Sequence, residues 1–283
     1  MKNETIKYIT SETISGFGKW LYSEERAKGT VEKYVRDVKA FSIWLDGREI
    51  SRESVADWKT SLLEAEYQPV TINSMLASIN TFCRYTGLDC RIKFLKVQKR
   101  VFRDEDKELT QAEYERLIMT AQKKGNERLA MLLETIGATG IRVSEVQYIT
   151  VEAAKVGRTQ ITLKGKIREI MLPKKLCRKL IKYAQRQKIA SGEIIITRSG
   201  KGLSRKQIWA DMKKLCKDAG VSETKVFPHN LRHLFARVFY RITRDIAKLS
   251  DLLGHSSIDT TRIYLLSSGK EHAQQLERLG LVQ

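Results

Sequence analysis

The 283-residue sequence predicts a mostly α-helical protein of two domains, with a small antiparallel sheet in the second domain. Three observations support this fold class. Apolar residues recur at helical spacing through the first hundred residues. A basic stretch that lacks this spacing follows, over residues 91–110. Two short runs rich in β-branched residues then interrupt a pattern that is otherwise helical.

The N-terminal part, residues 1–94, predicts a small helical bundle. Apolar stripes lie in residues 30–47 and 71–87, and two further helices are expected over residues 11–25 and 51–65. Because apolar positions three and four residues apart share one face of a helix, these stripes are expected to face a common core.

Residues 95–107 are expected to form an extended linker between the two domains. Basic side chains lie in it and just before it, at Arg91, Lys93, Lys96, Lys99, Arg100 and Arg103. Two interpretations fit this pattern. The segment is either a solvated connector or a strap whose six basic side chains bind a phosphate backbone.

The second domain, residues 108–283, is expected to open with a helix, because Thr110 and Glu113 have the spacing of a capping box. Helices are predicted through residue 148. The β-rich runs TQITL and IREIML come next, and the Lys164-Gly165-Lys166 loop between them predicts a hairpin.

The rest of this domain is expected to be helical apart from one more short strand. A helix is predicted near residues 174–188, and the run EIIIT, residues 193–197, is typical of a strand. A second capping box, Ser204 and Gln207, predicts the start of a helix that ends at Gly220.

The charge of the chain points to a polyanionic partner. The formal net charge is +19, and residues 1–100 carry 17 basic and 13 acidic side chains against 35 and 20 in the remainder. A surplus of this size favours nucleic acid over a membrane surface as the partner. The alternative is a basic protein without such a partner.

Several classes of protein are excluded by what the sequence lacks. No apolar run approaches the roughly 18 residues of a membrane span, and the N-terminus does not have the pattern of a signal peptide. The protein is therefore expected to be soluble and cytoplasmic. Its cysteines, which have no zinc-site spacing, are expected to be reduced thiols: Cys83, Cys90, Cys177 and Cys216. No metal site and no cofactor is predicted.

Four stretches of the second domain carry residue types suited to chemistry on a phosphate. They are GATGIRVSEV, the hairpin loop, PHNLRHLFA and LLGHSSIDTTRIY, and their candidate residues are Arg142, Lys164, His229, Arg232, His255 and Tyr264. Arginines bind phosphate oxygens as bidentate forks, and histidines exchange protons near neutral pH. A lysine can protonate a leaving oxygen. A tyrosine is a usable nucleophile only beside cations, because its free pKa is about 10.

Each of these residues taken alone also has an ordinary explanation. Arg142 could pair with Glu145, three residues further along a helix. Gly254 and His255 could simply end a helix, with the histidine in solvent, and Tyr264 could be a half-buried aromatic. The combination, in this order and within a basic domain, favours metal-free transfer of a phosphoryl group from DNA to a tyrosine.

Three of the stretches closely resemble the sequence boxes of the tyrosine recombinase family, also called phage integrases. The family patterns A-T-G-x-R-x-S-E, H-x-L-R-H and L-G-H-x-S-x-x-T-T-x-x-Y are present as ATGIRVSE, HNLRH and LGHSSIDTTRIY. The resemblance covers almost the whole chain and implies a SAM-like helical N-terminal domain and a C-terminal catalytic domain. The compact layout is similar to the Xer type, without an additional N-terminal arm-binding domain.

The resemblance implies a role for each matching residue. Arg142 and Arg232 clamp the scissile phosphate, and Tyr264 attacks it to leave a 3′-phosphotyrosyl link and a free 5′-hydroxyl. The two histidines assist this reaction: His229 in proton transfer and phosphate contact, His255 as a hydrogen-bond partner of the phosphate. The hairpin lysine protonates the leaving oxygen, and Glu145 orients its neighbours without reacting.

Two departures from the family pattern are present. The hairpin sequence LKGKIRE is one residue shorter than GKGNKxR, so Lys164 aligns best as the general acid and Lys166 remains an alternative. Leu234 stands where the family usually has threonine, and we expect this change to affect helix packing only.

The resemblance also implies partners. The two domains would clamp double-stranded DNA at an inverted-repeat core site, and four protomers would exchange strands through a Holliday junction. The C-terminal segment 269–282 predicts an amphipathic helix that docks on a neighbouring protomer, or else on its own domain. A partner recombinase or an accessory factor is compatible with this picture, as is association with the nucleoid.

Two other functions compete with recombination. One is that of a non-catalytic DNA-binding relative, which the presence of all six candidate residues disfavours. The other is that of a type IB topoisomerase, which shares the chemistry but which the Xer-like boxes and the tail helix disfavour.

Overall fold

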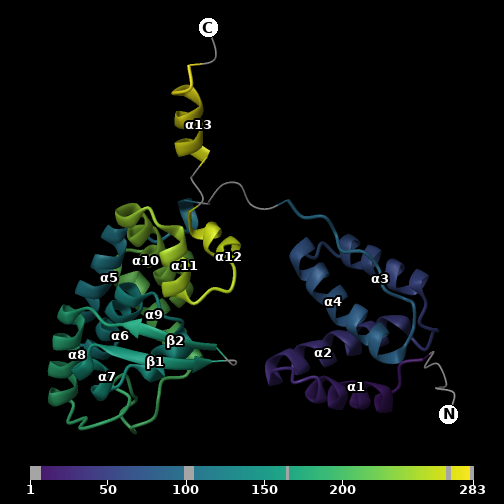
Figure 1. The fold of residues 1–283 in the computed structure, drawn as a ribbon, viewed down its shortest axis with the longest axis horizontal. Helices are drawn as coiled ribbons and strands as arrows, with labels where there is room; N and C mark the ends of the chain where they lie inside the picture. The colour runs from purple at the N-terminus through teal and green to yellow at the C-terminus, as the bar shows by residue number, and fades with distance from the viewer. Residues whose placement is uncertain (1–7, 99–104, 164–165, 266–268, 281–283) are drawn as a thin grey trace. The chain divides into compact units, whose positions relative to one another are not determined.

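The computed structural model describes residues 8–98, 105–163, 166–265 and 269–280 (Figure 1). The chain divides into two compact units, residues 1–99 and 100–283. Each unit has a hydrophobic core of its own. Among the described residues, no helix is both long and apolar enough to cross a membrane.

The N-terminal unit is a bundle of four helices, as the apolar stripes predict. Its helices are α1 (Ser11–Ser23), α2 (Lys28–Leu45), α3 (Arg52–Glu64) and α4 (Pro69–Thr86). Helices α1 and α3 begin at capping boxes on Thr10 and Ser51. The stripes meet in a core in which Phe17, Phe41 and Phe82 are fully buried.

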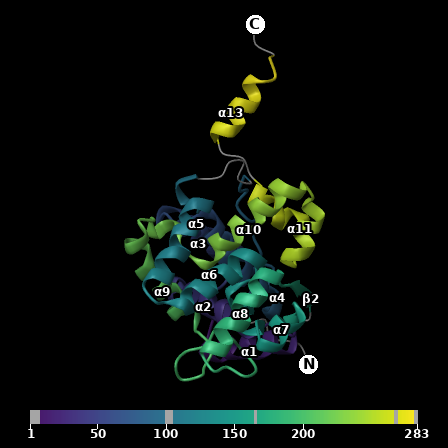
Figure 2. The same ribbon diagram turned by 90° about the vertical axis from the view of Figure 1, so that its left-hand side faces the viewer.

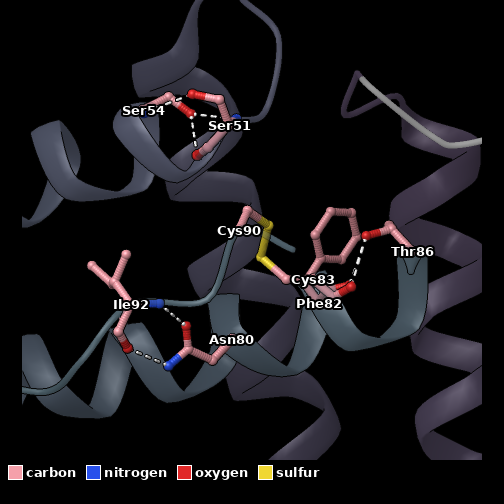
Figure 3. The surroundings of a disulfide bond; sticks show 8 residues. All are labelled: Ser51, Ser54, Asn80, Phe82, Cys83, Thr86, Cys90 and Ile92. Atoms are coloured by element: carbon pink, nitrogen blue, oxygen red, sulfur yellow. Dashed lines mark hydrogen bonds between the residues drawn. A yellow bond between two sulfur atoms is a disulfide. The ribbon is translucent and has the colours of Figure 1, made fainter. Parts of the chain in front are cut away.

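A disulfide bond joins the end of α4 to the segment that follows it (Figure 3). The prediction that all four cysteines are reduced thiols is therefore wrong for Cys83 and Cys90. Gly87 ends α4 in the left-handed conformation, with φ +75°, and turns the chain back along the helix. This turn brings the two Cα atoms to 5.9 Å, within the range that a disulfide bridges. Cys177 and Cys216 are free and buried.

Residues 88–98 have no regular secondary structure but are hydrogen-bonded to α4. The side-chain amide of Asn80 pairs with the N–H and C=O of Ile92 (Figure 3). That of Asn73 pairs in the same way with Leu95. Seven helical residues span about 10.5 Å and three extended ones about 10 Å, so the two amides match the segment in length. The start of the basic stretch, residues 92–95, therefore lies against the bundle, up to the first residue of the expected linker.

The C-terminal unit is mainly helical and contains the predicted hairpin (Figures 1 and 2). Its α-helices are α5 (Gln111–Lys123), α6 (Glu127–Thr139), α7 (Val151–Val156), α8 (Lys174–Arg186), α9 (Arg205–Ala219), α10 (Pro228–Thr243), α11 (Ile246–Leu253), α12 (Ile258–Arg262) and α13 (Gly269–Glu277). Its 3₁₀ helices are η1 (Glu105–Lys107), η2 (Val143–Tyr148), η3 (Glu223–Lys225) and η4 (Ile263–Leu265).

The sheet is a two-stranded antiparallel hairpin of β1 (Arg158–Leu163) and β2 (Lys166–Met171), in which Ile161 pairs with Arg168. The two predicted capping boxes are present and start α5 and α9. The strand predicted over residues 193–197 is wrong: only isolated bridges form there, between Thr150 and Glu193 and between Ile196 and Gly202. Ile194 and Ile195 are apolar because they are buried in the core, not because they belong to a sheet.

Helix α10 occupies the centre of the part of this unit that carries the candidate residues. It packs against α6, α11 and η4 (Figures 1 and 2). It therefore lies beside the ends of the other segments that contain candidate residues.

Candidate active site

Helix α10 presents His229, Arg232 and His233 on one side. Pro228 occupies its first position, where the missing N–H of proline costs nothing. Residues three and four apart share a helix face, so the HNLRH sequence places two histidines and an arginine together. The Arg232 side chain is buried, with 2% of the residue exposed.

The buried charge of Arg232 is held by carbonyl groups at the ends of two helices. Its Nη1 donates to the carbonyl oxygen of Gly140 at 2.5 Å, and its Nη2 donates to that of Leu253 at 2.7 Å. Gly140 ends α6 and Gly254 ends α11, both at positive φ. The last carbonyls of a helix have no partner within it and carry the negative end of its dipole, so they suit a guanidinium.

The C-terminal turn of α11 receives two more arginines in the same way. Arg168 Nη1 donates to the carbonyl of Leu252 at 3.2 Å, and Arg142 Nη2 lies 3.5 Å from the carbonyl oxygen of Gly254. A Cβ atom on Gly254 would lie 2.6 Å from the Arg168 side chain, so this position has no room for a larger residue. Three guanidinium groups thus converge on one helix end.

One buried carboxylate organises two of these arginines. Glu145 is 1% exposed. Its oxygens lie 2.9 Å from Arg142 Nη1 and 2.5 Å from Arg168 Nη2, and Oε2 also accepts from the backbone N–H of Arg142 at 2.7 Å. The pairing of Arg142 with Glu145 that the sequence suggested is therefore present. It orients the Arg142 side chain, which still faces solvent. With one carboxylate to three guanidinium groups, the cluster keeps a positive excess.

His255 is hydrogen-bonded at both ring nitrogens. Nε2 lies 2.9 Å from Arg232 Nη2, and Nδ1 lies 2.8 Å from the Thr261 hydroxyl. The backbone N–H of His255 donates to the carbonyl of Ser250, which continues the turn after α11. The histidine at this helix end is therefore half-buried and fixed, not solvated.

Tyr264 lies within the same unit as the arginines and is 3% exposed. Its ring is stacked on that of His255, with centroids 5.7 Å apart, and meets the edge of His233 at 4.4 Å. The His229 ring centroid is 6.0 Å away. The η4 turn that carries Tyr264 packs on α10, so the tyrosine belongs to its own protomer's cluster.

Burial and neighbouring cations lower the pKa values of the charged and titratable groups here. Desolvation is the main cause of the lowered pKa of Arg232, to about 10, and the charge of Arg142 adds to it. Desolvation followed by the charge of Arg232 lowers the pKa of His255 to about 4. The same two causes lower the pKa of His229. At neutral pH these histidines are uncharged and the arginines remain cations.

A cleft opens beside this cluster. It is lined by the basic side chains of Arg142, Arg168 and Arg205, by His255, and by the carboxylates of Glu145 and Asp251. The cleft opens to the side chains of Arg142, Arg168 and Arg205, while Arg232 is buried behind them. Arg205 comes from the first turn of α9, so a fourth segment contributes charge to the site.

The structure brings five of the six predicted catalytic residues together: Arg142, His229, Arg232, His255 and Tyr264. Lys164 lies outside the described residues, and Lys166 is the first residue of β2. Of the six residues expected to bind DNA, Arg91, Lys93 and Lys96 are exposed on the segment along α4. Lys99, Arg100 and Arg103 lie outside the described residues.

Comparison with known proteins follows the same division into two units. The model described as "Phage integrase family" matches residues 107–271, more than half of the chain. The model described as "Phage integrase, N-terminal SAM-like domain" matches residues 14–86. The chain belongs to the phage integrase family. This membership confirms the resemblance that the three boxes carry.

The relatives of this integrase-family chain include named recombinases. The tyrosine recombinase XerA of Pyrococcus furiosus is 28% identical over 285 residues, covering 98% of this chain and 97% of XerA. A crystal structure of a lambda integrase tetramer bound to a Holliday junction has a TM-score of 0.72 at 18% identity, covering 93% of this chain and 78% of that one. The XerH recombinase in its pre-cleavage complex with difH has a TM-score of 0.66 at 17% identity, covering 96% and 90%. These two structures share the mostly helical two-domain fold.

Arg168 belongs to the site but was not among the residues predicted from the sequence. A signal for it existed, because side chains two apart in a strand share a face, and Ile170 is buried. An arginine on the buried face of a hairpin needs an acidic partner, and Glu145 supplies it.

Proposed function

We propose that this tyrosine site-specific recombinase cleaves and rejoins DNA through Tyr264, with Arg142 and Arg232 holding the scissile phosphate. The Tyr264 oxygen attacks phosphorus, the bond to the 5′ oxygen breaks, and a 3′-phosphotyrosyl link forms. Rejoining reverses these steps when a 5′-hydroxyl attacks the link and Tyr264 leaves. No external energy is needed, because the link keeps the energy of the phosphodiester.

The observation that carries this proposal is the placement of a buried tyrosine beside a cationic cluster at a cleft. The transition state of phosphoryl transfer gathers negative charge on its non-bridging oxygens. Guanidinium groups already held at the site stabilise that charge with little reorganisation, and in many enzymes such preorganised charges contribute more to the rate than any other effect. Arg168 adds to this field, and His229, whose ring centroid is 6.0 Å from that of Tyr264, is the candidate to accept or relay the tyrosine proton.

We assign the protonation of the leaving 5′ oxygen to Lys164, with Lys166 as the alternative. The support is the hairpin between β1 and β2, whose Arg168 contacts the arginine cluster at Glu145. A lysine at the hairpin loop can supply a proton from a flexible side chain.

For the DNA, we propose an inverted-repeat core site gripped by residues 1–94 and 108–283, with residues 95–107 as the linker. The exposed side chains of Arg91, Lys93 and Lys96 support a phosphate contact by the segment along α4. They project from a segment that two asparagines hold in place. A fixed row of cations loses less entropy on binding a phosphate backbone than a free linker does.

For the assembly, we propose a homotetramer on two synapsed sites, with α13 exchanged between protomers. The solved relative is a tetramer on a Holliday junction. Leu276 and Leu279 of the tail are exposed and offer an apolar face to a neighbour. A partner recombinase or accessory factor could complete the synapse, and the reaction would take place on the nucleoid in the cytoplasm.

The test is the capture of the covalent intermediate. Duplex DNA is selected from a random pool by binding to the full chain, then nicked near the cleavage position so that the cut fragment diffuses away. The wild type should form a protein–DNA adduct that survives denaturation. Tyr264→Phe should bind the same duplex with unchanged affinity and form none.

Three outcomes would contradict the proposal. An adduct in the Tyr264→Phe variant would assign the nucleophile to another residue. Tight binding by the wild type without any adduct, on nicked or intact duplexes, would favour a non-catalytic DNA-binding protein. Relaxation of supercoiled plasmid by monomers, without a selected site, would instead favour a type IB topoisomerase activity.

A further inference from the structure

Thr261 makes the hydrogen bond that fixes the ring of His255. It lies in α12, three residues before Tyr264, and is fully buried. Its hydroxyl oxygen is 2.8 Å from His255 Nδ1, and the other ring nitrogen faces Arg232. A buried hydroxyl at this distance is the hydrogen-bond partner of that ring nitrogen, and it holds the half-buried ring in place.

The partners of His255 decide which ring nitrogen carries the proton. A guanidinium has only donors, so Nε2 must accept from Arg232 Nη2. Nδ1 is then the protonated nitrogen and donates to the Thr261 oxygen. The structure therefore holds neutral His255 as the Nδ1–H tautomer, in agreement with the lowering of its pKa to about 4.

This tautomer leaves His255 without a donor for a phosphate. Its single N–H donates to Thr261, and the lone pair on Nε2 accepts from Arg232. A second proton on the ring is opposed by the neighbouring arginines. For His255 to donate to a phosphate oxygen, Nε2 must carry the proton while Nδ1 becomes an acceptor.

Threonine suits both states, because its hydroxyl either accepts or donates by rotation about the Cβ–Oγ1 bond. When Arg232 turns its Nη2 toward a phosphate, Nδ1 loses its proton to solvent and Nε2 takes one up. The Thr261 hydroxyl then donates to Nδ1. The ring keeps its position while its donor moves to the side of the phosphate.

We propose that Thr261 is a positioning residue that supports both tautomers of His255, so that the histidine turns from acceptor for Arg232 into donor to the scissile phosphate. This inference rests on the proposed function of the site. It predicts that a hydroxyl at residue 261 is required for the chemical step, whereas DNA binding does not need it.

The experiment compares Thr261→Val, which keeps the shape and removes the hydroxyl, with Thr261→Ser, which keeps the hydroxyl. Thr135→Val is the matched control: Thr135 is also fully buried in a helix, but its hydroxyl bonds only the carbonyl of Met131. We expect Thr261→Val to form adduct on bound, nicked duplex at least tenfold more slowly than wild type. Thr261→Ser should stay within about threefold of the wild-type rate, and Thr135→Val should match it.

The tautomer itself is read from the ¹⁵N shifts of His255 in the full chain. Free wild type should show a protonated Nδ1, and the complex of Tyr264→Phe with the same duplex should show a protonated Nε2. In free Thr261→Val the Nδ1–H form should persist, because Arg232 still donates to Nε2. In the double variant Thr261→Val/Tyr264→Phe bound to the duplex, the ring should no longer show the single Nε2–H form, because no hydroxyl donates to Nδ1. A purely structural role for Thr261 would lower stability without changing these shifts.

Three results would overturn the inference: a wild-type rate in Thr261→Val, a protonated Nε2 in the free protein, or an unchanged tautomer on DNA binding. The last two are read without cleavage. They therefore remain decisive if the wild type forms no adduct, an outcome that contradicts the proposed function instead.

Discussion

His233 illustrates, at the scale of single residues, how the site keeps its histidines neutral. It stands between the rings of His229 and Tyr264, at 4.6 and 4.4 Å. Desolvation, then the charges of His229 and Arg237, lower its pKa to about 3. A neutral imidazole can pack edge-on against the tyrosine, whereas a charged one would repel the arginine cluster.

This lowered pKa predicts an acid-sensitive fold. The unfolded chain binds a proton at residue 233 near pH 6.5, whereas the folded chain does so only near pH 3. Stability is therefore complete above pH 6.5 and is lost progressively as pH falls below it. The wild-type melting temperature should drop between pH 7 and pH 5, and His233→Gln should show a smaller drop over the same range.

The comparison uses the slope of melting temperature against pH within each protein. A loss of packing caused by the substitution lowers the melting temperature at every pH and does not change this slope. The range stops at pH 5 because carboxylates such as Glu113, whose pKa is lowered, titrate further down. Equal slopes for wild type and variant would mean that His233 takes up its proton in the folded state as readily as in the unfolded state.

At the scale of elements, α10 has a second functional face. Side chains seven residues apart share a side of a helix, and Asn230 and Arg237 bind the chain just before α5. Asn230 donates to the carbonyl of Lys107 at 2.8 Å, and Arg237 donates to the carbonyl of Leu109 at 2.6 Å and pairs with Glu108. The end of the expected linker is thus fastened to the helix that carries Arg232.

Removing this attachment should affect both stability and catalysis. Arg237→Met breaks a partly buried ion pair, which costs up to about 3 kcal/mol of unfolding free energy. It should also slow adduct formation on bound DNA, since α10 loses a contact that fixes its position. Urea unfolding and the adduct assay on the full chain measure the two effects.

The matched control is Lys225→Met, because the ion pair between Lys225 and Glu113 has similar burial but does not involve a side chain of α10. We expect that variant to lose stability and keep its adduct rate. The charge-reversed pair, Glu108→Arg with Arg237→Glu, should recover part of both losses. An unchanged adduct rate in a folded Arg237→Met would show that the attachment does not position α10.

At the scale of the whole molecule, two units with separate cores are joined by a linker that is attached at both ends. Asn73 and Asn80 hold residues 92–95 to α4, and the disulfide between Cys83 and Cys90 closes the turn before them. These two attachments shorten the stretch of chain between the anchored points of the two units. A shorter linker raises the effective concentration of one DNA-binding unit once the other has bound.

The disulfide should stabilise only the N-terminal unit. Closing so short a loop lowers the conformational entropy of the unfolded chain, which raises the free energy of unfolding by about 2–3 kcal/mol. Three of the four tryptophans, Trp20, Trp44 and Trp58, lie in this unit, so tryptophan fluorescence follows its unfolding. Reductant should lower that transition by several degrees and leave the C-terminal unit unchanged by hydrogen exchange.

Cys90→Ser should show the lowered transition with or without reductant, which separates the bond from other effects of the reagent. A wild-type transition that does not respond to reductant, in a protein whose thiols are shown to be reduced, would contradict a stabilising role.

Much of this protein could be predicted from local pattern. The four N-terminal helices, the hairpin and both capping boxes follow from periodicity and spacing, because they depend on residues close in sequence. The three boxes identified the family, and five of their residues meet in one cluster, of which Arg142 and His255 line the cleft. The prediction of a strand over residues 193–197 was wrong because an apolar run is equally typical of a buried loop packed in a core.

The sequence by itself determined the helical fold class, the strongly basic charge of the chain and the residues to expect at the site. Only the tertiary structure decided that Cys83 meets Cys90, that Arg168 joins Glu145, and that Thr261 is hydrogen-bonded to His255. These contacts depend on where helices end and on which carbonyls and side chains then face one another. Distances of this kind arise from packing among separate segments, and spacing along the chain does not encode them.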